Sequence, residues 1–185
     1  MWLQCRGGTA SRVWFNVNGE DERESRTEPP TRCNQREAWA IKEFVEKLLS
    51  QNVQISQITI ICYYAGQCDL LARLLENQSD PQSFKISTVD TYQGCENDVI
   101  IVSMTRTRTL GFLANRRLKL LHEDSNPRCN VSMTRARGVL VIFGRHETYT
   151  SVGESEYLGR LARDVAARRE VLRAEDISSV EFCRS

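Results

Sequence analysis

The sequence predicts an α/β fold, in which a mostly parallel sheet is covered on both sides. Short β-branched runs alternate along the chain with stretches of helical periodicity, the order that βαβ units produce. The middle runs are apolar without alternation, as expected of strands that are buried on both faces. The length of 185 residues fits a single domain over residues 1–185.

The expected strands are short runs rich in Val and Ile. In chain order they cover residues 13–17, 57–63, 85–89, 98–104 and 138–144. The segment 19–32 carries many charges and two prolines, Pro29 and Pro30, and it predicts an exposed loop.

Three helices are expected beside these strands. Asn34 and Glu37 have the spacing of a capping box, in which each side chain accepts a hydrogen bond from the backbone of the other residue. An apolar stripe at helical spacing follows in Ile41, Phe44, Val45, Leu48 and Leu49. Four leucines between residues 70 and 75 mark a second helix, which residues 77–81 end. A C-terminal helical extension over about residues 154–175 is marked by Leu158, Leu161, Val165 and Leu172.

The composition excludes several classes of protein. Hydrophobic residues make up 41% and charged residues 26%, typical of a soluble globular protein, and no apolar run approaches a bilayer span. The seven cysteines are scattered without a C-x-x-C pair, and they signal neither a metal site nor a disulfide framework. Because no secretory signal is visible, we expect a cytoplasmic or nuclear location and no membrane partner.

The net charge of +1 conceals one basic stretch. Residues 104–137 carry eight Lys and Arg against two Asp and Glu. Such a cluster suggests a polyanionic partner, either a nucleotide or a nucleic-acid backbone. A solvated charged surface is an equally good interpretation from composition alone.

Three nucleotide-binding motifs are missing from the sequence. There is no G-x-x-x-x-G-K-[ST] phosphate loop, and no expected strand ends in the acidic pair that would hold magnesium. The chain therefore cannot supply a phosphate cradle by itself. No G-x-G-x-x-G follows a strand either, which disfavours a metabolic enzyme with a dinucleotide site.

Three polar segments adjoin the expected strands, and we expect all three near the carboxyl ends, where ligands bind in such folds. The first, residues 58–67, ends in Gln67, whose amide can donate and accept hydrogen bonds at once. A plain polar helix start is the alternative for this glutamine. The third, residues 128–137, carries Arg135, whose planar guanidinium matches phosphate oxygens. A surface arginine on a short helix is the alternative there.

The second polar segment, residues 86–96, is the densest. Gly94 would let backbone amides approach a phosphate closely, and Glu96 could accept hydrogen bonds from a ribose. Its other polar residues include Thr88, Asp90, Thr91 and Gln93. Ordinary loops are polar as well, so this segment alone is only a moderate signal.

In this order and spacing, the three segments resemble motifs IV, V and VI in the second RecA-like domain of superfamily 1 helicases, specifically the Upf-like group. The matching patterns are I-x-I-I-x-x-Y-x-x-Q, T-V-D-x-[FY]-Q-G-x-E-x-D-x-I-I-x-S and N-V-x-x-T-R-A-[RK]. The resemblance covers about residues 12–147, which we take as the core of the domain. The Gly-Phe-Leu at residues 111–113 further suggests the subgroup with NFX-type zinc fingers.

This resemblance implies a RecA-like, three-layer domain of the P-loop NTPase type that lacks its own phosphate loop. Such a domain is the C-terminal motor lobe of an ATP-dependent RNA or DNA helicase. Arg135 would be the catalytic arginine finger at the γ-phosphate, and the nucleotide would also meet Gln67, Gly94 and Glu96. The residues implied at the nucleic-acid backbone are Thr88, Asp90, Thr91 and Arg106. ATP and Mg²⁺ would be held mainly by an N-terminal RecA-like lobe, and the other partner would be single-stranded RNA or DNA.

The sequence departs from the helicase pattern in three respects. Cys95 stands where the family more often has a charged or polar residue, and residues 119–129 form an insertion. The first RecA-like lobe is absent, so we expect the isolated chain to be inactive. The alternative is a degenerate lobe that binds nucleic acid or a protein without completing an ATP site. Retention of Gly94, Glu96 and Arg135 argues against that alternative, whereas the missing lobe and the insertion argue for it.

Overall fold

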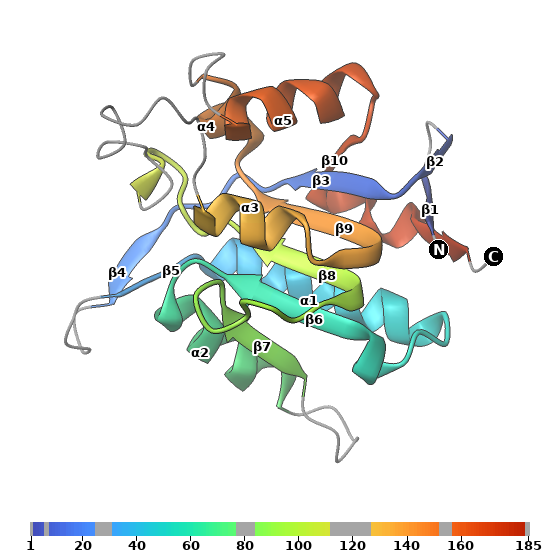
Figure 1. Ribbon diagram of the computed structural model, residues 1–185, viewed down its shortest axis with the longest axis horizontal. Helices are drawn as coiled ribbons and strands as arrows, with labels where there is room; N and C mark the ends of the chain where they lie inside the picture. The colour runs from blue at the N-terminus through green and yellow to red at the C-terminus, as the bar shows by residue number, and fades with distance from the viewer. Residues whose placement is uncertain are drawn as a thin grey trace.

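A six-stranded parallel sheet forms the centre of the molecule (Figure 1). The computed structural model describes residues 2–5, 8–24, 31–76, 84–111, 127–151 and 157–183. The strands lie in the order β10-β3-β9-β8-β6-β7, and every neighbouring pair is parallel. Their bounds are Arg12–Asn16 (β3), Ile58–Cys62 (β6), Lys85–Thr88 (β7), Asn97–Ser103 (β8), Ala136–Gly144 (β9) and Val171–Arg173 (β10). The predicted α/β class is confirmed.

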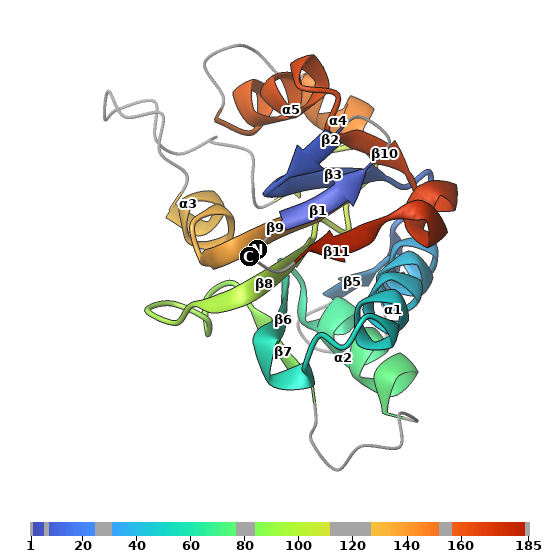
Figure 2. The ribbon, with the colours of Figure 1, turned by 90° about the vertical axis from the view of Figure 1, so that its right-hand side faces the viewer.

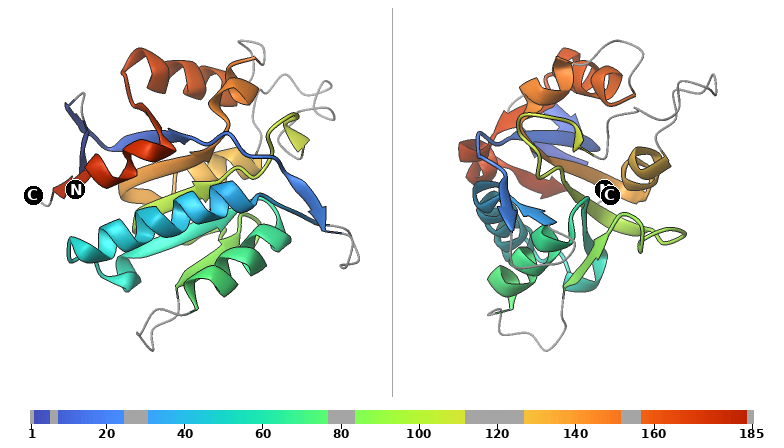
Figure 3. Two further views of the ribbon diagram at one scale, coloured as in Figure 1. Left: turned by 180° about the vertical axis from the view of Figure 1, so that it is seen from behind. Right: turned by 90° about the vertical axis from the view of Figure 1, so that its left-hand side faces the viewer.

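Helices cover both faces of this sheet (Figure 3). One face carries α1 and α2, and the other carries α3, α4 and α5. Their bounds are Gln35–Ser50 (α1), Ala65–Leu75 (α2), Pro127–Met133 (α3), His146–Thr150 (α4) and Tyr157–Ala167 (α5). A hydrophobic core lies on each face of the sheet, and successive strand residues point into the two cores alternately. Ile60 packs in the core on the α1 side, and Ile61 packs in the core on the α3 side. Both faces are buried, which explains why the central strands are apolar without alternation.

Short elements complete the fold. A three-stranded antiparallel sheet, in the order β11-β1-β2, brings the two ends of the described chain side by side (Figure 2). The bounds of the remaining strands are Trp2–Cys5 (β1), Gly8–Ala10 (β2), Glu22–Glu24 (β4), Thr31–Cys33 (β5) and Glu181–Cys183 (β11), and the 3-10 turns are Ile55–Gln57 (η1) and Ala174–Ser179 (η3). Because β4 pairs with β5, the segment 19–32 is not simply the exposed loop that we expected. Residues 25–30 lie outside the described part.

The expected C-terminal helical extension is wrong in its second half. Helix α5 ends at Ala167, and Arg169 takes a left-handed conformation with a φ of 60°. Glu170 then donates its backbone N–H to the carbonyl of Val165, at 2.8 Å, which closes the turn. The chain continues into β10, where Leu172 pairs with β3 as part of the main sheet. The C-terminal segment therefore completes the sheet.

The capping box at the start of α1 forms only in part. The side chain of Asn34 accepts a hydrogen bond from the backbone N–H of Glu37, at 3.1 Å, as predicted. The reciprocal bond is taken by Gln67, whose Oε1 accepts from the backbone N–H of Asn34 at 2.7 Å. The carboxylate of Glu37 instead accepts hydrogen bonds from Ser103 and Thr105.

Candidate functional site

The three polar segments lie at opposite ends of the sheet. In the first two segments, residues 63–67 follow the carboxyl end of β6 and residues 89–94 follow that of β7, as expected. Arg135 directly precedes β9 and so lies at an amino end. The expectation was therefore wrong for the third segment, because α3 comes before its strand, in front of the sheet (Figure 1). The seven residues of β8 separate the two ends by about 20 Å.

Helix α3 nevertheless brings all three segments into contact. The hydroxyl of Tyr63, just after β6, lies 2.6 Å from the hydroxyl of Ser132 on α3. The carboxylate of Asp90, just after β7, accepts two hydrogen bonds from the guanidinium of Arg128, at 2.8 and 3.0 Å. Each motif-bearing segment is thus attached to the helix that leads to Arg135.

The predicted nucleotide residues Gly94, Glu96 and Arg135 gather at the amino edge of β8 and β9. The backbone N–H of Asn97 donates to the carbonyl of Arg135 at 3.1 Å, which joins the starts of the two strands. Gly94 adopts a φ of 82°, a left-handed conformation that favours glycine, and no heavy atom lies within 4 Å of where a Cβ would stand. The backbone of Gly94 is therefore open to a ligand.

The two arginines of this edge differ in their partners. Arg137 pairs with the carboxylate of Asp98 at 2.9 Å and lies 3.8 Å from that of Glu96. The Arg135 guanidinium instead donates to the carbonyl of Val131 and the hydroxyl of Thr134, each at 3.1 Å. No carboxylate of the described residues pairs with Arg135. Its half-buried guanidinium is held by neutral groups and keeps its charge available for an anion.

A cluster of hydroxyl groups marks the end of β7. The side-chain oxygen of Thr91 lies 2.8 Å from that of Ser87 and 2.8 Å from that of Thr88. Thr91 is exposed, and the other two residues are partly exposed. These neutral groups can donate hydrogen bonds to phosphate oxygens, which is one way in which proteins bind nucleic-acid backbones.

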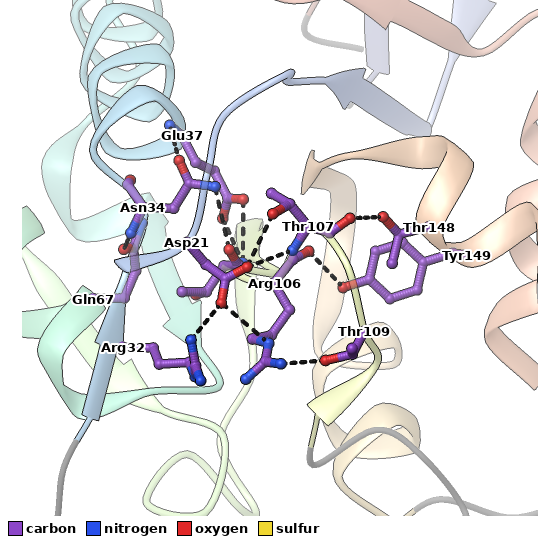
Figure 4. A network of polar contacts seen from close by, with 11 residues as sticks. Asp21, Arg32, Asn34, Glu37, Gln67, Arg106, Thr107, Thr109, Thr148 and Tyr149 are labelled. Atoms are coloured by element: carbon purple, nitrogen blue, oxygen red, sulfur yellow. Dashed lines mark hydrogen bonds and ion pairs between the residues drawn. The ribbon is translucent and has the colours of Figure 1, made fainter. Parts of the chain in front are cut away.

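Gln67 has an internal role at the opposite edge of the sheet (Figure 4). Its side chain is fully buried, and its amide binds the backbone of Asn34 through Oε1 at 2.7 Å and Nε2 at 3.4 Å. These bonds tie the start of α1 to α2. The structure therefore does not bring Gln67 together with Arg135, Gly94 and Glu96.

Arg106 is likewise engaged inside the domain (Figure 4). Its Nε lies 3.3 Å from the carboxylate of Asp21, and the side chain of Arg106 is only 15% exposed. Asp21 also pairs with Arg32 at 2.8 Å and accepts from the backbone and hydroxyl of Thr107. Burial alone raises the pKa of Asp21, but the Thr107 hydrogen bonds and the two arginines together lower it below its ordinary value. The ion pair with Asp21 therefore holds most of the Arg106 side chain against the domain.

Glu37 is the residue of this network that our sequence reasoning placed wrongly. Its fully buried carboxylate accepts hydrogen bonds from the hydroxyl of Ser103 and from the backbone N–H of Thr105, the latter at 2.9 Å. Burial raises its pKa to about 8, although these hydrogen bonds act in the other direction. A signal was present, because Glu37 lies four residues before Ile41 and so shares the apolar stripe of α1.

The fold and the sequence similarities together define the class of this domain. The parallel sheet with helices on both faces is consistent with a RecA-like domain, and the family match and the relatives below identify it as the C-terminal RecA-like domain of the Upf-like superfamily 1 helicases. Residues 3–147 match a family described as an AAA domain, and this chain belongs to that family.

Several curated proteins are similar to this chain. DNA polymerase alpha-associated DNA helicase A of Saccharomyces cerevisiae is 34% identical over 152 residues, which is 79% of this chain and 21% of that protein. Regulator of nonsense transcripts 1 of Caenorhabditis elegans is 34% identical over 60% of this chain and 10% of its own length. NFX1-type zinc finger-containing protein 1 of Mus musculus is 36% identical over 56% of this chain and 5% of its own length. The chain spans about a fifth or less of these relatives.

Two other kinds of site have no counterpart among the described residues. No helix in this part of the chain is both long enough and apolar enough to cross a membrane. Within the same ranges, His, Cys, Asp and Glu side chains do not form a group of three or more that could hold a metal ion.

Proposed function

We propose that this domain is the C-terminal motor lobe of an ATP-dependent helicase that acts on RNA or DNA. The observation that carries the proposal is the different pairing of Arg135 and Arg137. Arg137 is neutralised by carboxylates, whereas Arg135 is held by neutral groups at the end of α3. An arginine fixed in this way can act on negative charge brought by another molecule.

In the proposed site, Arg135 is the arginine finger, which neutralises charge on the transferring phosphoryl group. Gly94 offers an open backbone to a phosphate, and Glu96 accepts hydrogen bonds from the ribose. These groups fit a nucleoside triphosphate, but the described residues offer no donor set for Mg²⁺. We assign the metal and the phosphate loop to an N-terminal RecA-like lobe. Bound ATP supplies the phosphoryl group whose transfer to water drives the cycle.

The proposed strand-binding surface begins at Thr88 and Thr91. Their hydroxyls lie on an edge of the sheet, beside the loop that leads to Gly94. We had also expected Asp90 and Arg106 to contact the nucleic-acid strand. Instead, each forms an ion pair within the domain, Asp90 with Arg128 and Arg106 with Asp21. In this proposal Asp90 and Arg106 help to shape the surface, and Thr88 and Thr91 contact the backbone of the nucleic-acid strand.

The test uses the longer protein that contains this domain together with a phosphate-loop lobe. We expect release of phosphate from ATP that single-stranded RNA or DNA stimulates. We also expect ATP-dependent separation of a fluorescent duplex with a single-stranded tail. A cooperatively folded protein that showed neither activity would overturn the motor proposal.

A degenerate lobe is the second candidate function. One observation favours it: three residues expected to contact a ligand have partners within the domain instead. The amide of Gln67 binds the backbone of Asn34, and Asp90 and Arg106 each form an ion pair. Such a lobe would bind single strands with an affinity that ATP leaves unchanged. The same assays, with strand binding measured with and without ATP, separate the two functions.

A further inference from the structure

The ion pair between Asp90 and Arg128 joins two of the motif-bearing segments. Nε and Nη2 of Arg128 each donate to a different oxygen of the Asp90 carboxylate, at 2.8 and 3.0 Å. This bidentate arrangement fixes the orientation of both groups as well as their separation. Arg128 lies in the first turn of α3, so the contact fixes the start of that helix to the end of β7.

Helix α3 depends on such contacts for its position. It has only seven residues, and an isolated helix of this length is not stable in water. Two further contacts hold it: the 2.6 Å hydrogen bond between Tyr63 and Ser132, and the packing of Met133 in the core that contains Tyr92. Asp90 provides the charged contact at one end of the helix.

The position of α3 determines the position of Arg135. The Arg135 guanidinium donates to the carbonyl of Val131 within α3, at 3.1 Å. Arg135 itself follows the helix after a single intervening residue. A shift of α3 therefore carries this guanidinium with it.

We propose that Asp90 is a positioning residue, which places the Arg135 guanidinium by holding Arg128 and hence α3. This inference rests on the proposed function, in which Arg135 acts on the phosphoryl group. It changes the role that we expected for Asp90, because a carboxylate at a nucleic-acid backbone would repel the phosphates. The Asp90 charge is neutralised by Arg128 of the same domain.

The effect of the pair on helix position is modest, and its effect on rate is larger. The side chains of Arg128 and Asp90 are 44% and 60% exposed. An exposed pair shifts an equilibrium by about fivefold at most. A misplacement of about 1 Å can reduce the rate of a reaction by about 100-fold. We therefore expect a fall in kcat on the order of tenfold, between these limits.

The experiment compares Asp90→Asn with the charge-swapped double variant Asp90→Arg/Arg128→Asp. Hydrogen exchange of the α3 amides is measured in this domain, and kcat, KM for ATP and strand affinity are measured in the longer two-lobe protein. Glu46→Gln is the matched control, because it removes a partly exposed ion pair, that of Lys42 and Glu46 on α1, on the opposite face of the sheet. We expect Asp90→Asn to accelerate exchange in α3 by about fivefold. We also expect Asp90→Asn to lower kcat with little change in KM. The charge-swapped double variant should restore part of the exchange protection of α3 and part of kcat.

Each other outcome has a definite meaning. Loss of strand affinity with an unchanged kcat would place Asp90 at the nucleic acid and overturn the positioning role. Failure of the swap to restore exchange or turnover would overturn it as well. If the wild-type protein hydrolysed no ATP, the proposed function would fail, and α3 exchange would still decide whether Asp90 holds the helix.

Discussion

Replacement of Arg135 is the sharpest test of the proposed motor lobe. The guanidinium is expected to stabilise negative charge that develops in the transition state, so its loss should lower kcat more than nucleotide affinity. Arginine fingers contribute on the order of 10³ to 10⁵ in rate, which corresponds to about 4 to 7 kcal/mol. Arg135→Ala should therefore reduce turnover by at least three orders of magnitude on this scale. Arg135→Lys should be nearly as damaging, because an ammonium keeps the charge but loses the planar fork.

The structure predicts that this loss is not a loss of folding. The hydrogen bonds of the Arg135 guanidinium go to Val131, which lies within α3, and to Thr134, which directly follows that helix. Removing them should cost about 1 kcal/mol of unfolding free energy. The melting temperature should therefore change far less than the turnover.

Arg137→Ala is the matched control. Arg137 lies two residues further along the chain, and its ion pairs with Asp98 and Glu96 are at least partly exposed. Exposed pairs of this kind contribute about 1 kcal/mol at most, so stability should fall slightly and turnover should change little. Steady-state ATPase assays of the two-lobe protein at saturating RNA compare the three variants. If Arg135→Ala kept more than about a tenth of the turnover, well above the range for arginine fingers, the assignment would be refuted.

The isolated 185-residue domain should unfold cooperatively on heating but release no phosphate from ATP, with or without RNA; turnover that survives removal of contaminating ATPases would contradict this. Its binding to fluorescent single-stranded RNA should weaken as salt rises, because the basic stretch of residues 104–137 would displace counterions from the RNA, with a slope of about 0.7 per phosphate contacted. Anisotropy that does not change with salt would contradict a contribution of these basic residues to binding. Burial raises the pKa of Glu37 to about 8, well above that of an unfolded chain, so the folded state binds the additional proton between these values. The free energy of unfolding should therefore fall as pH rises from about 5 to about 8, and Glu37→Gln should flatten this dependence in thermal unfolding measurements. Parallel pH profiles for variant and wild type would refute the role of Glu37.

The central strands of the main sheet, such as β6 and β8, could be predicted because they are buried on both faces and therefore largely apolar. The strand β10 could not, because Leu172 lies seven residues after Val165 and fits the periodicity of α5. The left-handed turn that separates them uses Arg169, and a non-glycine residue gives no warning of such a turn. Local patterns thus predict long elements better than the breaks between them.

The candidate site was predictable in its residue types but not in its arrangement. Gly94, Glu96 and Arg135 share an edge only because β8 and β9 are parallel neighbours, and the order of strands is not written in any one segment. The engagement of Gln67 and Arg106 was also hidden, since their partners Asn34 and Asp21 are distant in sequence. Tertiary contacts decided which polar side chains remain available to a ligand.

The place of β3 in the sheet sets the order in which the domain can assemble. This early strand pairs on one side with β9 and on the other with β10, so Trp14 lies beside Ile142 and Val171. During synthesis, β3 leaves the ribosome long before either partner exists. Until β9 and β10 are synthesised, β3 lacks both of its partner strands. Its residues Val13, Trp14 and Phe15, which are fully buried in the folded domain, then lack the strands that cover their backbone. Such distant pairing slows folding and leaves apolar surface open to aggregation, so we expect the nascent chain to need protection until its last strand emerges.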